Sequence, residues 1–221
     1  GRKDGEELGG FELMPELPEV ETIVGDLAPQ VEGRVFQEVT VYWAGALEEP
    51  GPDELVRELV GQRIESLSRR GKYILFHLGS GQALIIHLGM TGRLYISQPG
   101  EVADPHCVAG FLLHDGTGLH FADTRKFGRI WLVDEAARVV GRLGPEALDE
   151  SFGPGDLVER LNRRPAARIK ALLLDQSFLA GLGNIYTDEA LYEARIHPAR
   201  PAGSLPEGKV KELYRAIREV L

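Results

Sequence analysis

The sequence has a single cysteine and no long hydrophobic run, and both absences exclude classes of protein. Cys107 is alone among 221 residues, so an internal disulfide and a four-cysteine zinc site within this chain are excluded. A chain so poor in cysteine fits a reducing cytoplasm. No apolar stretch reaches the roughly 20 residues of a membrane-spanning helix, and residues 1–13 lack the apolar segment of a signal peptide. Hydrophobic residues still make up 43% of the chain, enough for one large domain or two modest ones.

The sequence also lacks an excess of basic residues. Its formal net charge of −9 argues against nucleic acid as a partner, because phosphate binding relies on Lys and Arg. The distribution of charge matters more than the sum. Basic residues gather at 69–72, 125–129 and 160–170, whereas acidic residues gather mainly at 4–12 and 48–58. A single basic cluster is typical of a solvated surface, but three of them make DNA binding as well supported as the alternative.

Hydrophobic patterning divides the chain into a β-rich part and a helical part. Short apolar runs between residues 34 and 133 are separated by turn signals such as 79–81 and 115–118, which is typical of a β-sandwich or barrel. The predicted class is α+β, with a β-rich domain at 14–142, a Gly-Pro linker at 143–155 and an all-α domain at 156–221. Helices are expected at 20–28, ending before Pro29, and at 53–60, 156–162, 166–174, 184–194 and 209–221.

Five short motifs follow one another along the chain. They are MPELPEVET at 14–22, RRGKY at 69–73, HLGMTG at 87–92, DTRKFG at 123–128 and LAGLGNIY at 179–186. Each motif alone is weak evidence, but five in this order are strong. On these motifs the chain resembles the formamidopyrimidine-DNA glycosylase family over nearly all of residues 14–221. Leu17 and residues 20–22 favour the branch that acts on oxidised purines; the endonuclease VIII branch, which acts on oxidised pyrimidines, is the alternative.

The resemblance implies a bifunctional DNA glycosylase and abasic-site lyase of base excision repair, acting on double-stranded DNA. The damaged base is turned out of the duplex, and a free N-terminal proline, here Pro15, attacks C1′ to form an iminium that permits β,δ-elimination. Glu16 is the expected general acid/base. Lys72 is expected to contact phosphate near the lesion, with an ordinary exposed lysine as the alternative. Glu19 either supports the site or simply favours a first helical turn.

Other residues match those with which the family grips DNA. Met90, Arg125 and Phe127 match the residues inserted into the duplex, where a sulfur chain and a ring replace lost stacking and a guanidinium pairs with the orphaned cytosine. The alternatives are core packing for Met90 and Phe127 and a surface ion pair for Arg125, but neighbouring glycines favour exposed loops. Asn184 is expected to start a helix as its N-cap and to bind phosphate there. Lys170 adds charge to this helix-two-turn-helix element.

The chain departs from the family pattern at both ends. While residues 1–13 and Met14 remain attached, the Pro15 nitrogen is an amide and cannot attack sugar. We therefore expect residues 1–13 to be a non-native or upstream leader, and the alternative is a catalytically blocked DNA-binding module. The family usually continues beyond residue 221 with a lesion-capping loop and a zinc-bound hairpin, so zinc is expected only there and no cofactor in this chain. The resemblance also implies a monomer in the bacterial cytoplasm, associated with the nucleoid.

Overall fold

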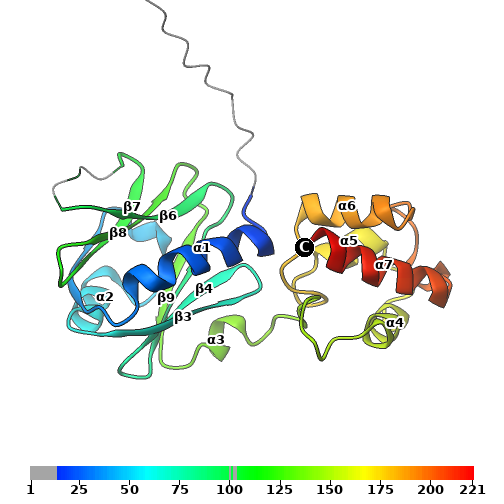
Figure 1. Ribbon diagram of the computed structural model, residues 1–221, viewed down its shortest axis with the longest axis horizontal. Coiled ribbons are helices and arrows are strands. Elements are labelled where there is room, and N and C mark those ends of the chain that lie inside the picture. Colours follow the sequence, from blue (N-terminus) through cyan, green and yellow to red (C-terminus); the bar gives the residue numbers. More distant parts are fainter. Residues whose placement is uncertain (1–13, 100, 102–103) are drawn as a thin grey trace, which may run out of the picture.

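Two lobes, one rich in β-strands and one helical, make up the part of the chain that the structure describes. The computed structural model describes residues 14–99, 101 and 104–221, so the expected leader at 1–13 lies outside the described residues. A connection that contains the short helix α3 (Ala137–Val140) joins the lobes (Figure 1). The α+β class and the order of the two parts are confirmed.

The first lobe is a sandwich of two sheets. One sheet has the strand order β1-β7-β8-β6 and the other β2-β9-β5-β4-β3, and every neighbouring pair is antiparallel except β2 with β9. Inward side chains of both sheets, including Phe36, Phe76, Phe111 and Phe121, share one buried core, as in other face-to-face sheet packings. The strands are β1 (Phe36–Val41), β2 (Leu47–Glu49), β3 (Ile64–Arg70), β4 (Tyr73–Leu78), β5 (Ala83–His87), β6 (Gly92–Ser97), β7 (Cys107–Leu113), β8 (Gly118–Asp123) and β9 (Arg129–Val133).

Two helices flank the sandwich. Helix α1 (Leu17–Val31) packs on β3, and α2 (Pro52–Leu59) packs on β1; the 3₁₀ turn η1 (Ala44–Ala46) precedes β2. The predicted end of α1 before Pro29 is wrong, because the helix continues through this proline to Val31. A proline removes one helical hydrogen bond, but Pro29 stands in the last turn, where the complete burial of Val31 holds the chain in place.

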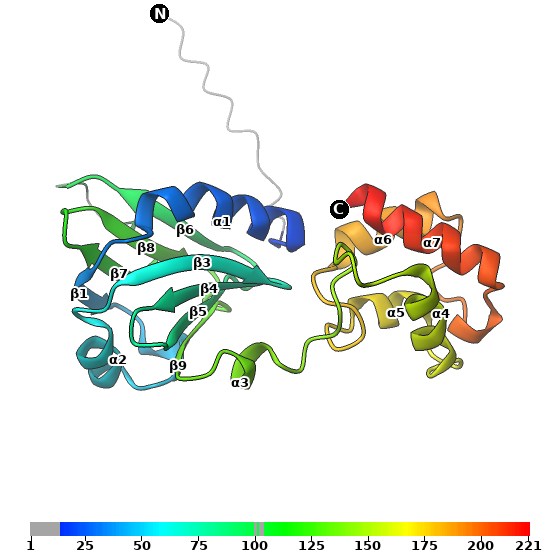
Figure 2. The same ribbon diagram turned by 60° about the horizontal axis from the view of Figure 1, so that its bottom comes forward.

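Strand β3 was not expected from the sequence. Of its seven residues only Ile64 is fully buried, since β3 lies at the edge of the five-stranded sheet, and its polar sequence therefore shows no strand pattern. It pairs with β4 so that Arg70 lies opposite Tyr73. This strand carries the basic residues of the second motif to the end of the sheet that faces the helical lobe (Figure 2).

The second lobe is a group of helices around its own core. The helices are α4 (Pro154–Asn162), α5 (Ile169–Leu174), α6 (Asn184–Glu193) and α7 (Glu207–Val220), with the 3₁₀ turn η2 (Ala202–Ser204) before α7. Leu157, Leu173 and Leu213 are among the completely buried residues of this core, and α6 packs on α5 and α7. No helix within the described part of the chain is both long and apolar enough to span a bilayer.

The beginning of α1 lies at the junction between the lobes. In both views its first turn points toward the helical lobe (Figures 1 and 2). The Leu17 N–H donates a hydrogen bond of 3.1 Å to the carbonyl of Gly181 in the loop before α6. The first and last of the five motifs, remote from each other in sequence, thus meet at this junction.

Candidate functional site

Glu16 joins the beginning of α1 to the beginning of α6. Its side chain is completely buried; one carboxylate oxygen accepts the Gly183 N–H at 2.5 Å and the other accepts the Ile185 N–H at 2.9 Å. Amides at a helix start have no partner within the helix and attract negative charge. The residue that follows Pro15 is therefore fixed against the helical lobe, and the half-buried Pro15 lies at the same junction.

The start of α6 differs from the prediction for Asn184. Gly183 is the N-cap and Asn184 is the first helical residue, so the predicted capping role of Asn184 is wrong. The acceptor comes instead from Glu16, which is remote in sequence. A side chain at residue 183 would clash with that carboxylate, since a Cβ there would lie 2.4 Å from the Glu16 Cδ. Glycine is thus required for the close approach of Glu16 to the helix.

Glu19 supports Glu16 directly. One of its carboxylate oxygens accepts the Glu16 N–H at 2.9 Å, and the other accepts the Tyr186 hydroxyl of α6 at 2.7 Å. Burial and the nearby Glu19 carboxylate raise the pKa of the Tyr186 hydroxyl, which therefore stays a donor. Glu19 fixes the backbone of Glu16 and adds a second contact between α1 and α6.

Lys72 faces the same junction. It lies in the turn between β3 and β4 and is only 8% exposed, which excludes the alternative of an ordinary exposed lysine. Burial lowers the pKa of Lys72, while the charges of Glu16 and Glu19 oppose that decrease. Because the pKa of Lys72 is lowered, its neutral amine forms more easily than that of an exposed lysine.

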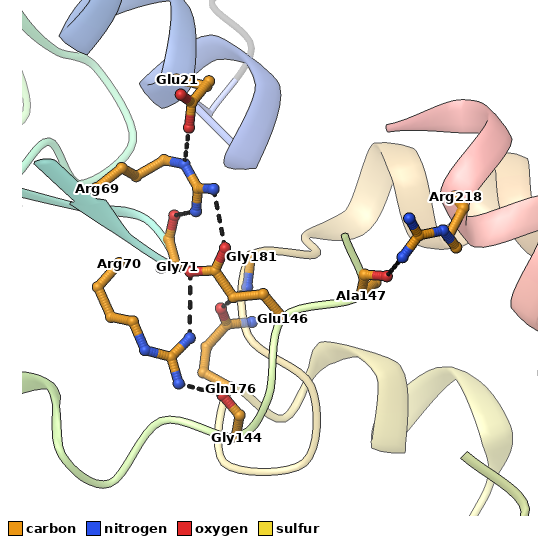
Figure 3. Close-up of polar contacts among 10 residues, drawn as sticks. All are labelled: Glu21, Arg69, Arg70, Gly71, Gly144, Glu146, Ala147, Gln176, Gly181 and Arg218. Atoms are coloured by element: carbon orange, nitrogen blue, oxygen red, sulfur yellow. Dashed lines mark hydrogen bonds and ion pairs between the residues drawn. The ribbon is translucent and has the colours of Figure 1, made fainter. Parts of the chain in front are cut away.

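A cluster of charged residues holds the two lobes together beside this site (Figure 3). The carboxylate of Glu146, from the helical lobe, lies 2.8 Å from Arg69 Nη2 and 3.1 Å from Arg70 Nη1, and it accepts the Gly71 N–H at 2.6 Å. Arg69 also contacts Glu21 of α1 at 2.5 Å. We call Arg69, Arg70, Gly71 and Glu146 the junction cluster. Arg69 and Arg70 of the first basic cluster are therefore neither part of a solvated face nor free to bind phosphate.

Ion pairs also balance much of the third basic cluster. Lys170, predicted to add charge for DNA, lies 2.7 Å from the Asp188 carboxylate of α6, and Arg164 lies 2.6 Å from Asp175. Within the described residues, by contrast, no carboxylate forms an ion pair with Arg125 or Lys126 of the second cluster. Arg125 and Lys126, in the loop between β8 and β9, thus carry charges that no carboxylate of the described residues balances.

Met90, Arg125 and Phe127 lie in two exposed loops of the β-rich lobe. Met90 is in the loop between β5 and β6 and is 38% exposed, and Phe127 is in the loop between β8 and β9 and is 49% exposed. The Arg125 guanidinium carbon lies 4.9 Å from the centre of the Phe127 ring. The alternatives of core packing and of a surface ion pair are thus excluded, and two large apolar side chains face solvent with a stacked cation.

His87 supports the Met90 loop and was missed as a functional residue, although it opens the third motif. Its Nδ1 accepts the Gly89 N–H at 3.1 Å, which requires a neutral ring with its proton on Nε2. Burial, together with the charges of Lys72 and Arg129, lowers the pKa of His87 to about 4. Its position at the end of an apolar strand was the available signal, because the last side chain of such a strand lies half-buried next to the loop that follows.

The neutral form of His87 makes stability depend on pH. Because its pKa is lower in the folded chain than the ordinary 6.5, its contribution is complete above pH 6.5 and is lost as pH falls toward 4. A difference of this size corresponds to about 3 kcal/mol. We expect His87→Asn, which keeps an acceptor for Gly89 and does not titrate, to flatten this part of the stability curve. Urea unfolding between pH 4 and 7 measures it, and parallel curves for both proteins would contradict the assignment.

The part of the chain that the structure describes contains no zinc site. Among the described residues, no group of three or more His, Cys, Asp and Glu side chains is placed to hold a metal ion, and the whole chain contains one cysteine. Tetrahedral zinc sites need four ligands, or three ligands and water.

The β-rich lobe is a two-sheet sandwich joined to a helical lobe, and a buried carboxylate lies beside the proline of the first motif. This arrangement defines the class of two-lobed DNA glycosylases with a helix-two-turn-helix element. Residues 14–130 match the formamidopyrimidine-DNA glycosylase N-terminal domain, and residues 143–221 match the formamidopyrimidine-DNA glycosylase H2TH domain. The chain belongs to the formamidopyrimidine-DNA glycosylase family.

Similar proteins agree with this membership. The chain is 44% identical over 209 residues to the formamidopyrimidine-DNA glycosylase of Protochlamydia amoebophila and 45% identical over 211 residues to that of Chloroflexus aurantiacus, covering 94% of this chain and 75% of each relative. A solved structure of the Lactococcus lactis enzyme, non-covalently bound to DNA with an abasic site, superposes with a TM-score of 0.85 at 34% identity, covering 92% of this chain and 79% of that one. Another, of the wild-type enzyme with DNA containing N7-benzyl-Fapy-dG, has a TM-score of 0.87.

Proposed function

We propose that this chain excises oxidised purines from double-stranded DNA and then cleaves the abasic strand, as a bifunctional DNA glycosylase and lyase. The observation that carries the proposal is the burial of Glu16 against the start of α6, directly after Pro15 and beside Lys72. This junction brings a potential amine nucleophile, a carboxyl group and a buried cation together. Its relatives carry the name of the same activity.

The proposed reaction divides one difficult displacement into easier steps. The Pro15 amine, once it is the chain terminus, forms a bond to C1′ as the bond between C1′ and the base breaks and the base leaves with a proton. Glu16 protonates the sugar ring oxygen, so that the ring opens to an iminium between Pro15 and C1′. The iminium withdraws electrons from C2′, where loss of a proton expels the 3′-phosphate and a second elimination expels the 5′-phosphate. Lys72 binds a phosphate beside the lesion.

The exposed loops supply the proposed contact with the duplex interior. Met90 and Phe127 fill the space that the everted nucleotide leaves, and Arg125 pairs with the opposite base. Lys170 and Asn184 lie in the helical lobe, where exchange of the Asp188 partner for phosphate would free the Lys170 charge. The solved relatives bound to abasic-site DNA and to Fapy-dG DNA support such a substrate. The proposed enzyme is a monomer that acts on nucleoid DNA in the cytoplasm and needs no cofactor within this chain.

A blocked DNA-binding module is the second candidate. In this sequence Met14 precedes Pro15, and an acylated proline nitrogen has no lone pair free to attack C1′. Such a chain would keep the DNA contacts and lose the covalent step. The two candidates therefore differ in one observable, a covalent link to DNA.

Borohydride trapping separates them. The chain is prepared both as given and with Pro15 as its first residue, and each is incubated with a duplex containing 8-oxoguanine and sodium borohydride. We expect an adduct at Pro15 only in the second form, located by mass spectrometry of the peptides. No adduct in either form, with binding retained, would favour the blocked module. An adduct on a chain that still begins at residue 1 would contradict the role of Pro15 and direct attention to Lys72, whose pKa is lowered.

A further inference from the structure

Asp123 is a buried carboxylate outside the proposed chemistry. It ends strand β8 and is 1% exposed. Burying a charge is costly unless hydrogen bonds or an opposite charge compensate it. Among the residues that the structure describes, no cation forms an ion pair with Asp123. Hydrogen bonds must therefore compensate the buried charge of Asp123, and the groups that donate them indicate the role of this residue.

Among the described residues, every hydrogen bond that the Asp123 carboxylate accepts comes from the two exposed loops. Its Oδ1 accepts the Thr91 hydroxyl at 2.5 Å and the Arg125 N–H at 3.1 Å, and its Oδ2 accepts the Gly128 N–H at 2.7 Å. Thr91 follows Met90, while Arg125 and Gly128 flank Phe127. The Arg125 N–H also lies 3.1 Å from the Thr91 hydroxyl oxygen. One carboxylate thus ties the Met90 loop to the Arg125–Phe127 loop.

Close packing of two glycines reinforces this connection. Gly89 has φ +66, and a Cβ on it would lie 2.7 Å from the Gly128 nitrogen; a Cβ on Gly128 would lie 2.3 Å from the Phe121 ring. No side chain separates the two loops at this point. Since both loops touch each other and share the Asp123 carboxylate, they cannot move independently without breaking hydrogen bonds to a buried charge.

We propose that Asp123 is a positioning residue that holds Met90, Arg125 and Phe127 together before the chain binds DNA. These three side chains then form one preformed wedge for insertion into the duplex. The inference rests on the proposed function, because the wedge has a use only where a nucleotide leaves the stack. A preformed wedge avoids the entropic cost of ordering two loops upon binding. Asp123 contributes to the discrimination between damaged and undamaged DNA, and it has no part in the covalent chemistry.

The test measures discrimination by the full chain. Fluorescence anisotropy at one fixed salt concentration gives the Kd for a duplex with a tetrahydrofuran abasic analogue opposite cytosine and for the matching undamaged duplex. Asp123→Asn keeps the size of the side chain but turns an NH₂ group toward one of the loop donors. We expect it to reduce the ratio of the two affinities by about tenfold or more, with the affinity for undamaged DNA changed by less than about threefold. Asp115→Asn, in the β7–β8 hairpin, is the matched control and should leave the ratio unchanged.

A second variant and a double mutant protect the test against simple misfolding. Thr91→Val removes one loop donor and leaves Asp123 in place, so a smaller loss of discrimination is expected. In a Phe127→Ala background, Asp123→Asn should have almost no further effect, because residues that act as one unit are non-additive. Equal loss of affinity for both duplexes, or full additivity with Phe127→Ala, would overturn the inference. Absence of any preference in the unchanged chain would instead count against the proposed function.

The free protein offers an independent readout. The Lys126 ammonium lies 5.2 Å from the centre of the Trp43 ring, so displacement of the Arg125–Phe127 loop changes the surroundings of that indole. In a Trp131→Phe background, Asp123→Asn is expected to shift or intensify Trp43 emission without changing the far-UV circular dichroism. An unchanged Trp43 spectrum would show that the loop keeps its position without Asp123.

Discussion

Replacing Glu16 with Gln, in the chain that begins at Pro15, is expected to slow release of an oxidised base by about 10²–10⁴-fold. The carboxyl group lies directly after the nucleophile, and a carboxamide cannot donate or accept the proton at the sugar ring oxygen. Single-turnover release of 8-oxoguanine from a duplex measures the effect. Elimination at a preformed abasic site should be far less affected, because its aldehyde condenses with the amine and no base needs to leave.

The contacts of Glu16 require a control for structure. Both carboxylate oxygens accept amides of the helical lobe, so the Gln NH₂ group would face an N–H donor, at a cost of about 1–3 kcal/mol. Glu19→Gln alters a neighbouring carboxylate that also connects α1 to α6, and we expect it to slow base release less than about tenfold. Loss of base release and of abasic-site cleavage to the same extent in Glu16→Gln would indicate a structural role only, and unchanged kinetics would remove Glu16 from the mechanism.

Replacing Glu146 with Ala is expected to uncouple the two lobes and to cost about 3–5 kcal/mol of unfolding free energy. The Arg69 side chain is 10% exposed and that of Glu146 is 14% exposed, so the change leaves a buried guanidinium without one of its two partners. It also leaves the Gly71 N–H without its acceptor. The large effect is expected because the substitution leaves these buried donors without an acceptor. The net contribution of an intact buried ion pair to stability is much smaller, because the cost of desolvation offsets the attraction.

Two spectroscopic signals distinguish uncoupling from general destabilisation. Both tryptophans, Trp43 and Trp131, lie in the β-rich lobe, whereas most helical residues lie in the other lobe. Tryptophan emission and circular dichroism at 222 nm should give coincident urea transitions in the unchanged chain and separate transitions in Glu146→Ala. Glu49→Ala breaks an exposed pair with Arg138 and should cost less than about 1 kcal/mol. A Glu146→Ala curve that resembles this control would refute the coupling.

The junction cluster also predicts how this contribution depends on pH. Burial acts to raise the pKa of Glu146, but the hydrogen bonds from Arg69 and Gly71 and the nearby Arg70 outweigh it and hold the pKa below its ordinary value of 4.5. The stabilisation is thus present above pH 4.5 and is lost as pH falls through the lower pKa of the folded chain. The difference in stability between the unchanged chain and Glu146→Ala should therefore shrink only below pH 4.5.

Local patterns predicted the features that depend on neighbouring residues. The turn signals at 79–81 and 115–118 mark the turns that join paired strands, and glycines beside Met90 and Phe127 predicted the exposed loops in which these residues lie. Such features follow from backbone freedom and from the alternation of apolar residues. The same reasoning ended α1 too early at Pro29, because it could not include the burial of Val31 against the sandwich.

Features that depend on residues remote in sequence could not be predicted in this way. The basic run at 69–72 was compatible with a solvated face or with DNA, and only the fold brings Glu146 to Arg69 and Arg70. The prediction for Asn184 failed for a similar reason, since the cap of α6 comes from a carboxylate at the other end of the chain. Strand β3 was not predicted because an edge strand buries few of its side chains, so its sequence need not alternate between apolar and polar residues.

The sequence alone determined the family, the two-part α+β organisation, and the identity of Pro15, Glu16 and Lys72 as candidates, because these depend on motif order and local periodicity. Only the tertiary structure decided that Glu16 caps a helix of the other lobe, that Glu146 connects the lobes and that Asp123 unites two loops. The physical reason is common to all three: a buried carboxylate takes whatever donors the fold places around it, and those donors lie anywhere in the chain.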